Sequence, residues 1–357
     1  MVYVGIDMHS RNMIITAIND NGELVKSQKI NCNEEERHCF FREFDQPIQA
    51  VVEATASWYW ISDWCQQQGI SLLLAHAKML KAISYAKVKT DAVDSRTLAE
   101  LLRAGLIPKA WKVSRYQRDL RELTRARLRL VVRRTSIQNQ IKTICGRYNA
   151  RLHGLSWADL DQIQRTLAGQ LPHEAMLDVT LSLEQLNAIQ IHVQRLEEAI
   201  EKNIWFSQSV QRLMEVPGIG RVTAWTIISE IGDIKRFPTD RKFVSYCRLV
   251  PGSKDSGQTK RHKSGSKDGN RYLKMVFMHA AIAAIRSYGP VRKYFNKIKR
   301  RSGQQVARAV IGKHLAKVVW HMLVKNQPFK GFKGHRCKES EKSGWPRPIN
   351  PKPSAGT

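Results

Sequence analysis

The feature that most constrains the fold is the order of short apolar segments in the first 75 residues. Three segments alternate as strands do, and the turn Asn19-Asp20-Asn21-Gly22 before the third contains Asn-Gly, the strongest short-range hairpin signal. A charged helical segment then ends at Pro47, before a buried strand, a second helix and a further strand. In chain order, the predicted strands and helices occupy residues 2–6, 13–18, 23–30, 34–44, 48–54, 58–68 and 70–75. This order predicts an α/β sheet of the RNase H type.

The middle of the chain is predicted to be helical, over residues 91–104 and again over 114–147. On the longer helix six arginines fall within an arc of about 120°, opposite leucine and isoleucine side chains. We expect one face to pack and the other to meet anions, the alternatives being a solvated surface or a non-specific DNA track. The six are Arg115, Arg118, Arg121, Arg125, Arg129 and Arg133.

Apolar residues over 183–204 have the spacing of a coiled coil, which predicts a hairpin with the preceding long helix or a dimer contact. In residues 215–232, Gly218 and Gly220 lie in a tight turn between helices, the form of a helix-hairpin-helix. Its amides can hold a phosphate, although such turns are common without one. The expected parts are an RNase H-like domain (1–110), a helical coiled-coil region (111–206), a mainly α domain (207–325) and a mobile basic tail (326–357).

The net charge of +28 indicates a polyanionic partner. Nucleic acid is the first expectation, although a ribosomal or membrane-surface protein would share this charge. The six cysteines show no pairing or zinc-ligand spacing and are expected to be reduced thiols in a cytosol. No signal peptide and no apolar run of about 18 residues is visible, so no membrane partner is expected.

Four acids are candidates for a metal site. Asp7 ends the first predicted strand, Glu53 ends the strand after the first helix, and Asp91 and Asp94 share one side of a helix start. Oxygen ligands select Mg²⁺ or Mn²⁺, and two such ions about 4 Å apart can assist phosphoryl transfer. The alternative is structural, because such residues also cap strands and helices or pair with arginine.

Ser256 is the candidate nucleophile, in an Asp-Ser-Gly sequence that opens a basic stretch. Taken alone, Asp-Ser-Gly is ordinary turn chemistry. The basic residues that follow can hold a phosphate backbone and would contribute affinity and salt dependence rather than sequence choice. They are Lys260, Arg261, Lys263, Lys267, Arg271 and Lys274.

Five motifs, in this order, carry a resemblance. They are GID at 5–7, VEAT at 52–55, KTDAVDSRTLAELLR at 89–103, VPGIG at 216–220 and LVPGSKDSG at 249–257. The chain resembles the DEDD transposases of insertion sequence family one-ten, relatives of the Piv-type DNA invertases. The resemblance implies a RuvC-like domain, a helical dimerisation region and a C-terminal transposase domain with an essential serine.

By the same resemblance, Asp7, Glu53, Asp91 and Asp94 bind metal and Ser256 attacks DNA. A phosphoserine linkage and a bridge RNA that pairs with donor and target DNA are implied, and the Arg115 to Arg133 face is the candidate RNA contact. The implied assembly is a homo-oligomer, a dimer or a dimer of dimers, in the bacterial cytoplasm and at the nucleoid when active. The alternatives are a RuvC-like junction nuclease that uses water and a non-catalytic basic nucleic-acid-binding protein.

Overall fold

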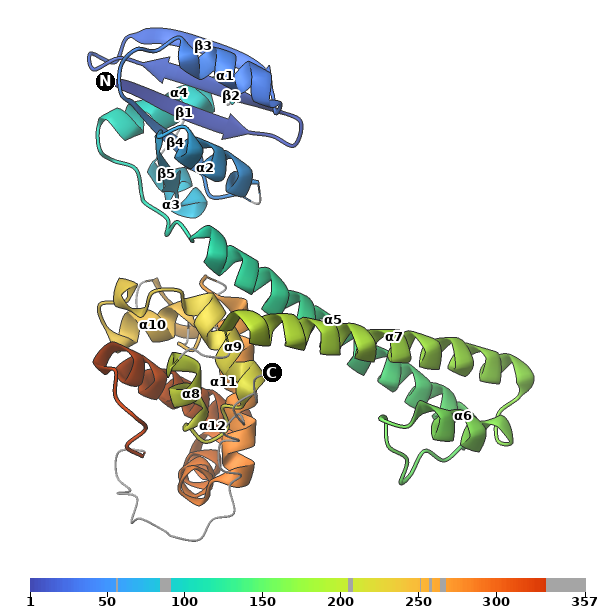
Figure 1. Ribbon diagram of the computed structural model, residues 1–357. Helices are drawn as coiled ribbons and strands as arrows, with labels where there is room; N and C mark the ends of the chain where they lie inside the picture. Colours follow the sequence, from blue (N-terminus) through green and yellow to red (C-terminus); the bar gives the residue numbers. More distant parts are fainter. Residues whose placement is uncertain are drawn as a thin grey trace, which may run out of the picture. The chain divides into compact units, whose positions relative to one another are not determined.

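The protein forms two compact units, Met1–Arg115 and Tyr116–Thr357, each described here by itself (Figure 1). The computed structural model describes residues 1–55, 57–83, 91–204, 208–250, 252–256, 259–263 and 268–331, with the backbone alone for 252–256 and 259–263. The predicted basic tail lies outside these residues from position 332 onward. In the described ranges no helix is long and apolar enough to cross a membrane. The finer division of the second unit near residue 206 stays a prediction.

The first unit is built on one five-stranded sheet. Its spatial order is β3 (Leu24–Asn31), β2 (Asn12–Ile18), β1 (Val2–Met8), β4 (Ile48–Glu53) and β5 (Ser71–Ala75). β1, β2 and β3 pair antiparallel, whereas β4 runs parallel to β1 and β5 runs parallel to β4. The predicted mixed α/β sheet is confirmed, and its topology is compatible with an RNase H-like domain.

The predicted turn sets the register of the antiparallel part. The side-chain oxygen of Asn19 accepts hydrogen bonds from the backbone N–H groups of Asn21 and Glu23, and Gly22 N–H donates to the Asn19 carbonyl. Gly22 has a φ of 85°, which glycine adopts without steric cost. This turn joins β2 to β3, whose register pairs Ile15 with Gln28, and on its other side β2 pairs Ile14 with Asp7 of β1.

Helices cover both faces of the sheet. α1 (Glu34–Arg42) and α2 (Trp58–Gln67) pack on one face, where Phe40 and Trp64 join the core. α4 (Asp91–Arg103) packs on the other, and its Leu98 and Leu102 meet Val51, the strand residue that faces away from the first core. Because successive strand residues point to opposite faces, β4 contributes to both cores. A short helix that the sequence did not indicate, α3 (Ala77–Ile83), follows β5.

Gly5 lets α4 lie directly against β1. A Cβ at this position would stand 1.9 Å from the Ser95 carbonyl oxygen and 2.7 Å from the Ala99 nitrogen, both backbone atoms of α4. The Ser95 hydroxyl also lies 2.7 Å from that of Thr16 on β2, in a buried hydrogen bond. α4 is therefore seated on the sheet by a close backbone contact and by one polar contact.

In the second unit, two long helices run antiparallel: α5 (Arg115–Arg147) and α7 (His173–Ile204). Tyr116 Oη donates to the Asn203 carbonyl near one end, and Ile141 of α5 shares a core with Leu183 of α7 toward the other. The predicted pairing is thus a hairpin within the chain, closed by α6 (Leu160–Ala168). α7 begins ten residues before the predicted start at 183, because its first turns pack on α5 and α6.

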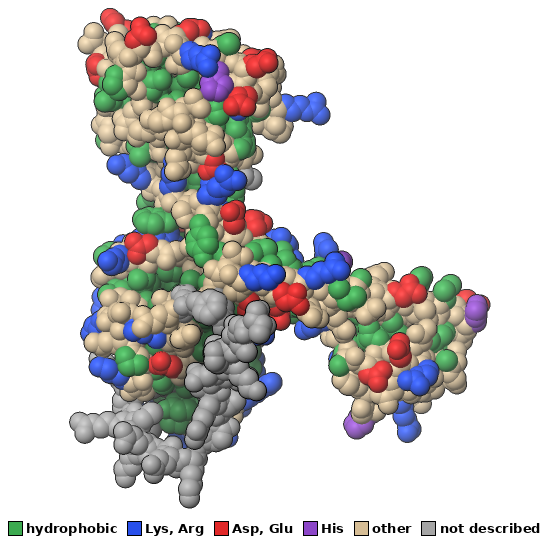
Figure 2. All heavy atoms as spheres, viewed as in Figure 1, with side chains coloured by type: hydrophobic (Ala, Val, Ile, Leu, Met, Phe, Trp, Pro, Cys, Tyr) green, Lys and Arg blue, Asp and Glu red, His purple; other side chains and the backbone are tan. Residues whose placement is uncertain are grey.

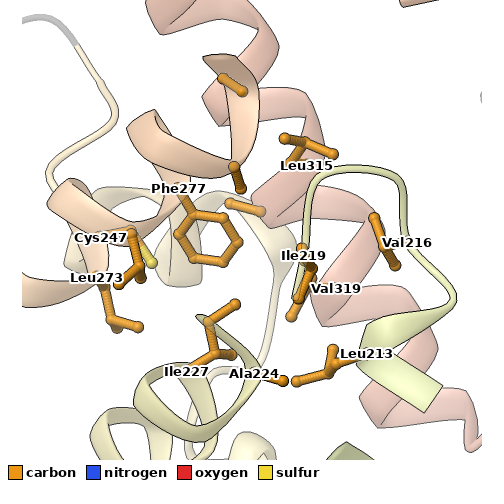
Figure 3. Packing of buried hydrophobic residues seen from close by; sticks show 14 of the residues in the cluster. Leu213, Val216, Ile219, Ala224, Ile227, Cys247, Leu273, Phe277, Leu315 and Val319 are labelled. Carbon is orange, nitrogen blue, oxygen red and sulfur yellow. The ribbon is translucent and has the colours of Figure 1, made fainter. Parts of the chain in front are cut away.

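The rest of the second unit is a helical bundle with one small hairpin. Phe277, Ile227 and Leu315 come from three of its helices and meet in its core (Figure 3). The elements are α8 (Gln208–Met214), α9 (Arg221–Ile231), the 3₁₀ turn η1 (Ile234–Arg236), α10 (Asp240–Tyr246), β6 (Gly252–Ser256), β7 (Thr259–Lys263), α11 (Arg271–Ser287) and α12 (Gly289–Lys325). The predicted mainly α composition is confirmed, whereas the helix-hairpin-helix assignment of α8 and α9 stays a prediction.

We predict that Gly5→Ala unseats α4 and lowers the free energy of unfolding by at least about 1–3 kcal/mol, the usual cost of overpacking a filled core. Thermal denaturation measures this. Gly146→Ala is the control, because a Cβ there meets nothing within 4 Å and alanine favours the α5 helix. An unchanged midpoint for Gly5→Ala would show that α4 does not need this contact.

Candidate active site

Two of the four predicted acids lie at the same edge of the sheet. β1 and β4 are parallel and pair Ile6 with Val52, so the next residue on each strand, Asp7 and Glu53, comes to the same position along the sheet. Glu53 is the last residue of β4, and both side chains are half-buried. The carboxyl ends of parallel strands are where open α/β sheets place ligands.

The other two acids come from the first turn of α4. Asp91 begins the helix and Asp94 lies one turn later, directly before Ser95, whose hydroxyl holds α4 to β2. Burial is the main cause that raises the pKa of Asp7; nearby His9 lowers it, and the charges of Asp91, Asp94 and Glu53 raise it further. The structure therefore brings all four carboxylates into one electrostatic neighbourhood.

His9 is a member of this group that the sequence analysis missed. Its Nε2 lies 3.3 Å from Asp7 Oδ2 and 3.1 Å from Asp91 Oδ2, and its side chain is 44% exposed. One atom from each of these three residues lies within 4.8 Å of the others, a spacing that a metal ion can bridge. The sequence did contain a signal for it. His9 follows Asp7 by two residues, and residues two apart in an extended chain point to the same side.

The donor set fits a divalent ion. Carboxylate oxygens suit Mg²⁺ and Mn²⁺, and an imidazole at the rim adds a nitrogen ligand that Mn²⁺ and softer ions accept more readily than Mg²⁺. Besides burial, the like charges of Asp91, Asp94 and Glu53 raise the pKa of Asp7, and a bound cation would relieve that repulsion. The site can thus bind a cation and present it at the open end of the sheet.

The predicted anion-facing surface of α5 needs correction. Arg118 and Arg121 are buried, and Arg121 donates to the carbonyls of Ser229 and Glu230 on α9. Half-buried Arg125 forms a two-point pair with the carboxylate of Glu230, at 2.6 and 2.9 Å. The prediction that all six arginines meet external anions is wrong for these three, because Arg118 is buried and because Arg121 and Arg125 bind the buried Glu230 of their own unit.

The remaining three arginines of that set are exposed: Arg115, Arg129 and Arg133. For them nucleic-acid contact stays a prediction. On the face drawn in Figure 2, Lys and Arg side chains are scattered over both units, with Asp and Glu side chains between them. The excess positive charge is not gathered into a single patch on that face.

The two glycines of the turn between α8 and α9 have different roles. Gly218 has a φ of 87°, and a Cβ there would stand 2.2 Å from the Ala280 carbonyl oxygen of α11, so close helix packing requires this glycine. Gly220 is the N-cap of α9, and a Cβ there would meet nothing within 4 Å. Phosphate contact at this helix start stays a prediction, but Gly218 is explained by packing.

Ser256 is the last residue of β6, paired with Thr259 at the start of β7. Its side chain and those of Lys260, Arg261 and Lys263 lie outside the described residues, as does the whole of Lys267. The other two basic residues of the predicted run, Arg271 and Lys274, are exposed on α11. Ser256 belongs to the second unit, whereas the four acids and His9 belong to the first.

We predict that Mn²⁺ or Mg²⁺ raises the thermal midpoint of the protein, and that Asp7→Asn and Asp91→Asn each remove most of this rise. An ion at 100 times its dissociation constant adds about 2.7 kcal/mol to the folded state. Calorimetry with and without each ion measures the effect. The exposed Asp45 supplies the control, Asp45→Asn, which should respond to the ions as the unchanged protein does. An equal shift in all four proteins would place ion binding elsewhere.

The pKa of Asp7 gives a second prediction. Because it is raised above its ordinary value of 3.8, ionised Asp7 costs stability above its folded-state pKa, and this cost disappears as the pH falls toward 3.8. With EDTA present, Asp7→Asn should raise the thermal midpoint at pH 7 and raise it less at pH 4.

Asp20 provides the opposite case in the same unit. Its hydrogen bond to the N-terminal ammonium group lowers the pKa of Asp20 below 3.8. Ionised Asp20 therefore stabilises the folded state at pH 7, and this stabilisation is lost as the pH falls through the lowered pKa. Asp20→Asn should lower the midpoint at pH 7. The same sign for both variants would contradict the assignment at Asp7.

Comparison with known proteins covers most of the chain. A family model for DEDD transposases of the IS110 type, described as a transposase, matches residues 4–149, and the model "Transposase IS116/IS110/IS902 family" matches residues 210–296. The first match contains the four acids and His9, and the second contains the α8–α9 turn and Ser256.

Curated relatives agree with both matches. A probable family 20 transposase of Pseudomonas aeruginosa is 27% identical over 299 residues, 80% of this chain and 86% of the relative. A transposase for insertion sequence element IS1111A of Coxiella burnetii is 25% identical over 68% of each chain, and one for IS1328 of Yersinia enterocolitica is 20% identical over 77% of this chain and 83% of its own. Because both units match models of one family in the expected order, this chain belongs to the IS110 family of insertion-sequence transposases, enzymes that cut and join DNA.

Proposed function

We propose that this transposase cuts and rejoins the strands of its insertion sequence by attack of Ser256 on a DNA phosphate, next to divalent ions held by the acids of the first unit. The observation that carries the proposal is the gathering of Asp7, Glu53, Asp91 and Asp94, with His9 at the rim, at one sheet edge. So many carboxylates in a chain with a net charge of +28 favour a cation-binding role over a structural one.

The proposed step is a phosphoryl transfer. The Ser256 oxygen forms a bond to phosphorus as one bridging P–O bond of the DNA strand breaks, and the released deoxyribose oxygen takes up a proton while the serine loses one. Two bound Mg²⁺ or Mn²⁺ ions would supply charge stabilisation at the attacking and leaving oxygens. A DNA hydroxyl then attacks the phosphoserine, which frees the serine and joins the new strand.

Asp7, Glu53, Asp91 and Asp94 are the proposed metal ligands. Their arrangement is fixed by two parallel strand ends and by the seat of α4 on the sheet. We assign His9 to the rim, where its exposed imidazole bridges Asp7 and Asp91. The proposal needs Ser256 of one protomer or of its partner to reach this edge in the assembled complex, a homodimer or a dimer of dimers.

The proposed nucleic-acid partners are donor and target DNA and a bridge RNA that selects them by base pairing. Exposed arginines of α5, Arg115, Arg129 and Arg133, are the proposed RNA backbone contacts. For DNA the basic stretch after Ser256 is joined by exposed side chains of α12 that the sequence analysis did not single out: Lys297, Arg300 and Arg301 precede a bend at Gly303, whose φ is 79°. Such contacts supply affinity that salt weakens.

The test is a covalent adduct. The protein is incubated with Mg²⁺, the RNA encoded beside its gene and labelled donor DNA, and a denaturant-resistant protein–DNA species is sought. We expect it with the unchanged protein, and expect Ser256→Ala and Asp7→Asn to reduce it by a factor on the order of 10³ or more, as loss of a nucleophile or its activating group does.

Ser253 on the same strand gives the matched control, since Ser253→Ala should still form the adduct. Strand cleavage that needs the acids, leaves no adduct and survives Ser256→Ala would replace the proposal with a nuclease that uses water. DNA binding without cleavage in any of these proteins would indicate a non-catalytic role.

A further inference from the structure

The two ends of the segment that carries Ser256, residues 247–269, are held together by hydrogen bonds among Tyr246, Arg248, Gly269 and Asn270, which we call the neck. Asn270 N–H donates to the Tyr246 carbonyl at 2.6 Å, and Arg248 Nε donates to the Gly269 carbonyl at 2.7 Å. Tyr246 ends α10 and Asn270 precedes α11, so these two hydrogen bonds join the ends of the segment 247–269. Cys247 and Leu273, beside the two ends, both belong to the core of the bundle (Figure 3).

The neck requires glycine at position 269. Its φ is 101°, and a Cβ there would stand 2.4 Å from the Tyr246 carbonyl oxygen and 3.2 Å from Tyr246 Cα. These are backbone atoms, which cannot swing away as the end of a long side chain can. Any side chain at 269 would therefore push the two ends of the segment apart.

Asn270 links the neck to the interior of the unit. Its Oδ1 accepts from the N–H groups of Tyr272 and Leu273, which caps α11, while its Nδ2 donates to Glu230 Oε2 at 2.7 Å. Asn270 is 8% exposed and uses both ends of its amide. Aspartate could supply the cap but not the donor, and it would set one carboxylate against another.

Glu230 is the fixed point of this arrangement. It is fully buried on α9, pairs at two points with Arg125 and lies 3.6 Å from Arg121. Arg125 also stacks on Tyr272, 4.7 Å from its ring centre, so α5, α9 and α11 meet at one carboxylate. A buried, multiply hydrogen-bonded ion pair has little freedom to shift, which makes it a rigid reference for the neck.

We infer that Gly269, Asn270 and Glu230 are positioning residues for the attack of Ser256 on DNA, an inference that rests on the proposed function. They orient the Ser256 segment through its neck without touching DNA. A buried salt bridge is a weak device for stability, because a packed apolar cluster of the same volume often serves as well. The same salt bridge does fix the orientation of the groups bonded to it. Orientation matters here, because displacing a reacting group by about 1 Å can cost on the order of 10²-fold in rate.

The first test is Asn270→Asp, which keeps the helix cap and loses the donor to Glu230. We expect adduct formation to slow on the order of 10²-fold while the affinity for donor DNA is retained. An unchanged rate in Asn270→Asp, or a loss of rate matched by an equal loss of DNA affinity, would overturn the inference.

The second test is Gly269→Ala, which carries the experiment if Asn270→Asp fails to fold. Its matched control is Gly154→Ala, because Gly154 also has a positive φ, 82°, but a Cβ there meets nothing within 4 Å. Both variants place alanine at a positive φ, and only Gly269→Ala sets a Cβ against the backbone of Tyr246 and opens the neck. We expect slow adduct formation in Gly269→Ala alone; equal rates in the two variants would refute the role of the neck.

A third measurement does not depend on the chemistry. Amide hydrogen exchange should become faster over residues 252–263 in Gly269→Ala, with α9 and α11 unchanged relative to Gly154→Ala. Absence of this local difference would refute the inference even if no adduct forms. If the unchanged protein forms no adduct, the proposed function fails, whereas the exchange result still decides whether the neck holds the segment.

Discussion

The site in the first unit depends on the contact between α4 and the central strand of the sheet. Asp7 and Glu53 are placed by strand pairing alone, but Asp91 and Asp94 belong to a helix that must lie on β1 to reach them. Gly5 removes the side chain that would hold the helix off, and the Ser95–Thr16 hydrogen bond fixes the helix along the strand. A glycine two residues before the first acid thus determines whether the four acids form one site.

Gathering these carboxylates opposes folding, and the energetic cost falls on Asp7. Burial and three like charges raise its pKa, and His9 offsets only part of that. The exposed His9 lies beside both Asp7 and Asp91 and does not bring the pKa of Asp7 back to its ordinary value. That arrangement leaves the repulsion available to be relieved by a metal ion, which is how sites built for function rather than stability are organised.

How much the sequence predicted depended on the range of the interaction. The hairpin at Asn19 to Gly22 and the strands around it follow from local signals, and so do the positions of the four acids at strand and helix ends. The arginine face of α5 was found by periodicity, but two of its members, Arg121 and Arg125, were assigned to the wrong partner, because periodicity shows which residues share a face and not what lies against it. Glu230, 105 residues beyond Arg125, could not be recognised as that partner from spacing. His9 was missed because a single histidine after a strand is not distinctive until α4 brings Asp91 beside it.

Three glycines, two of them in the motifs GID and VPGIG, share one physical role, and it is not the one that glycine-rich turns suggest. Gly5 meets the backbone of α4, Gly218 meets that of α11, and Gly269 meets the end of α10, in each case closer than a Cβ allows. Gly5 of GID and Gly218 of VPGIG are therefore required by packing between elements distant in the chain. A phosphate needs only open amides, as at Gly220, where a side chain would meet nothing. Gly5 holds α4 and Gly269 holds the neck of the serine segment, so these glycines secure the contacts that place the candidate chemical groups.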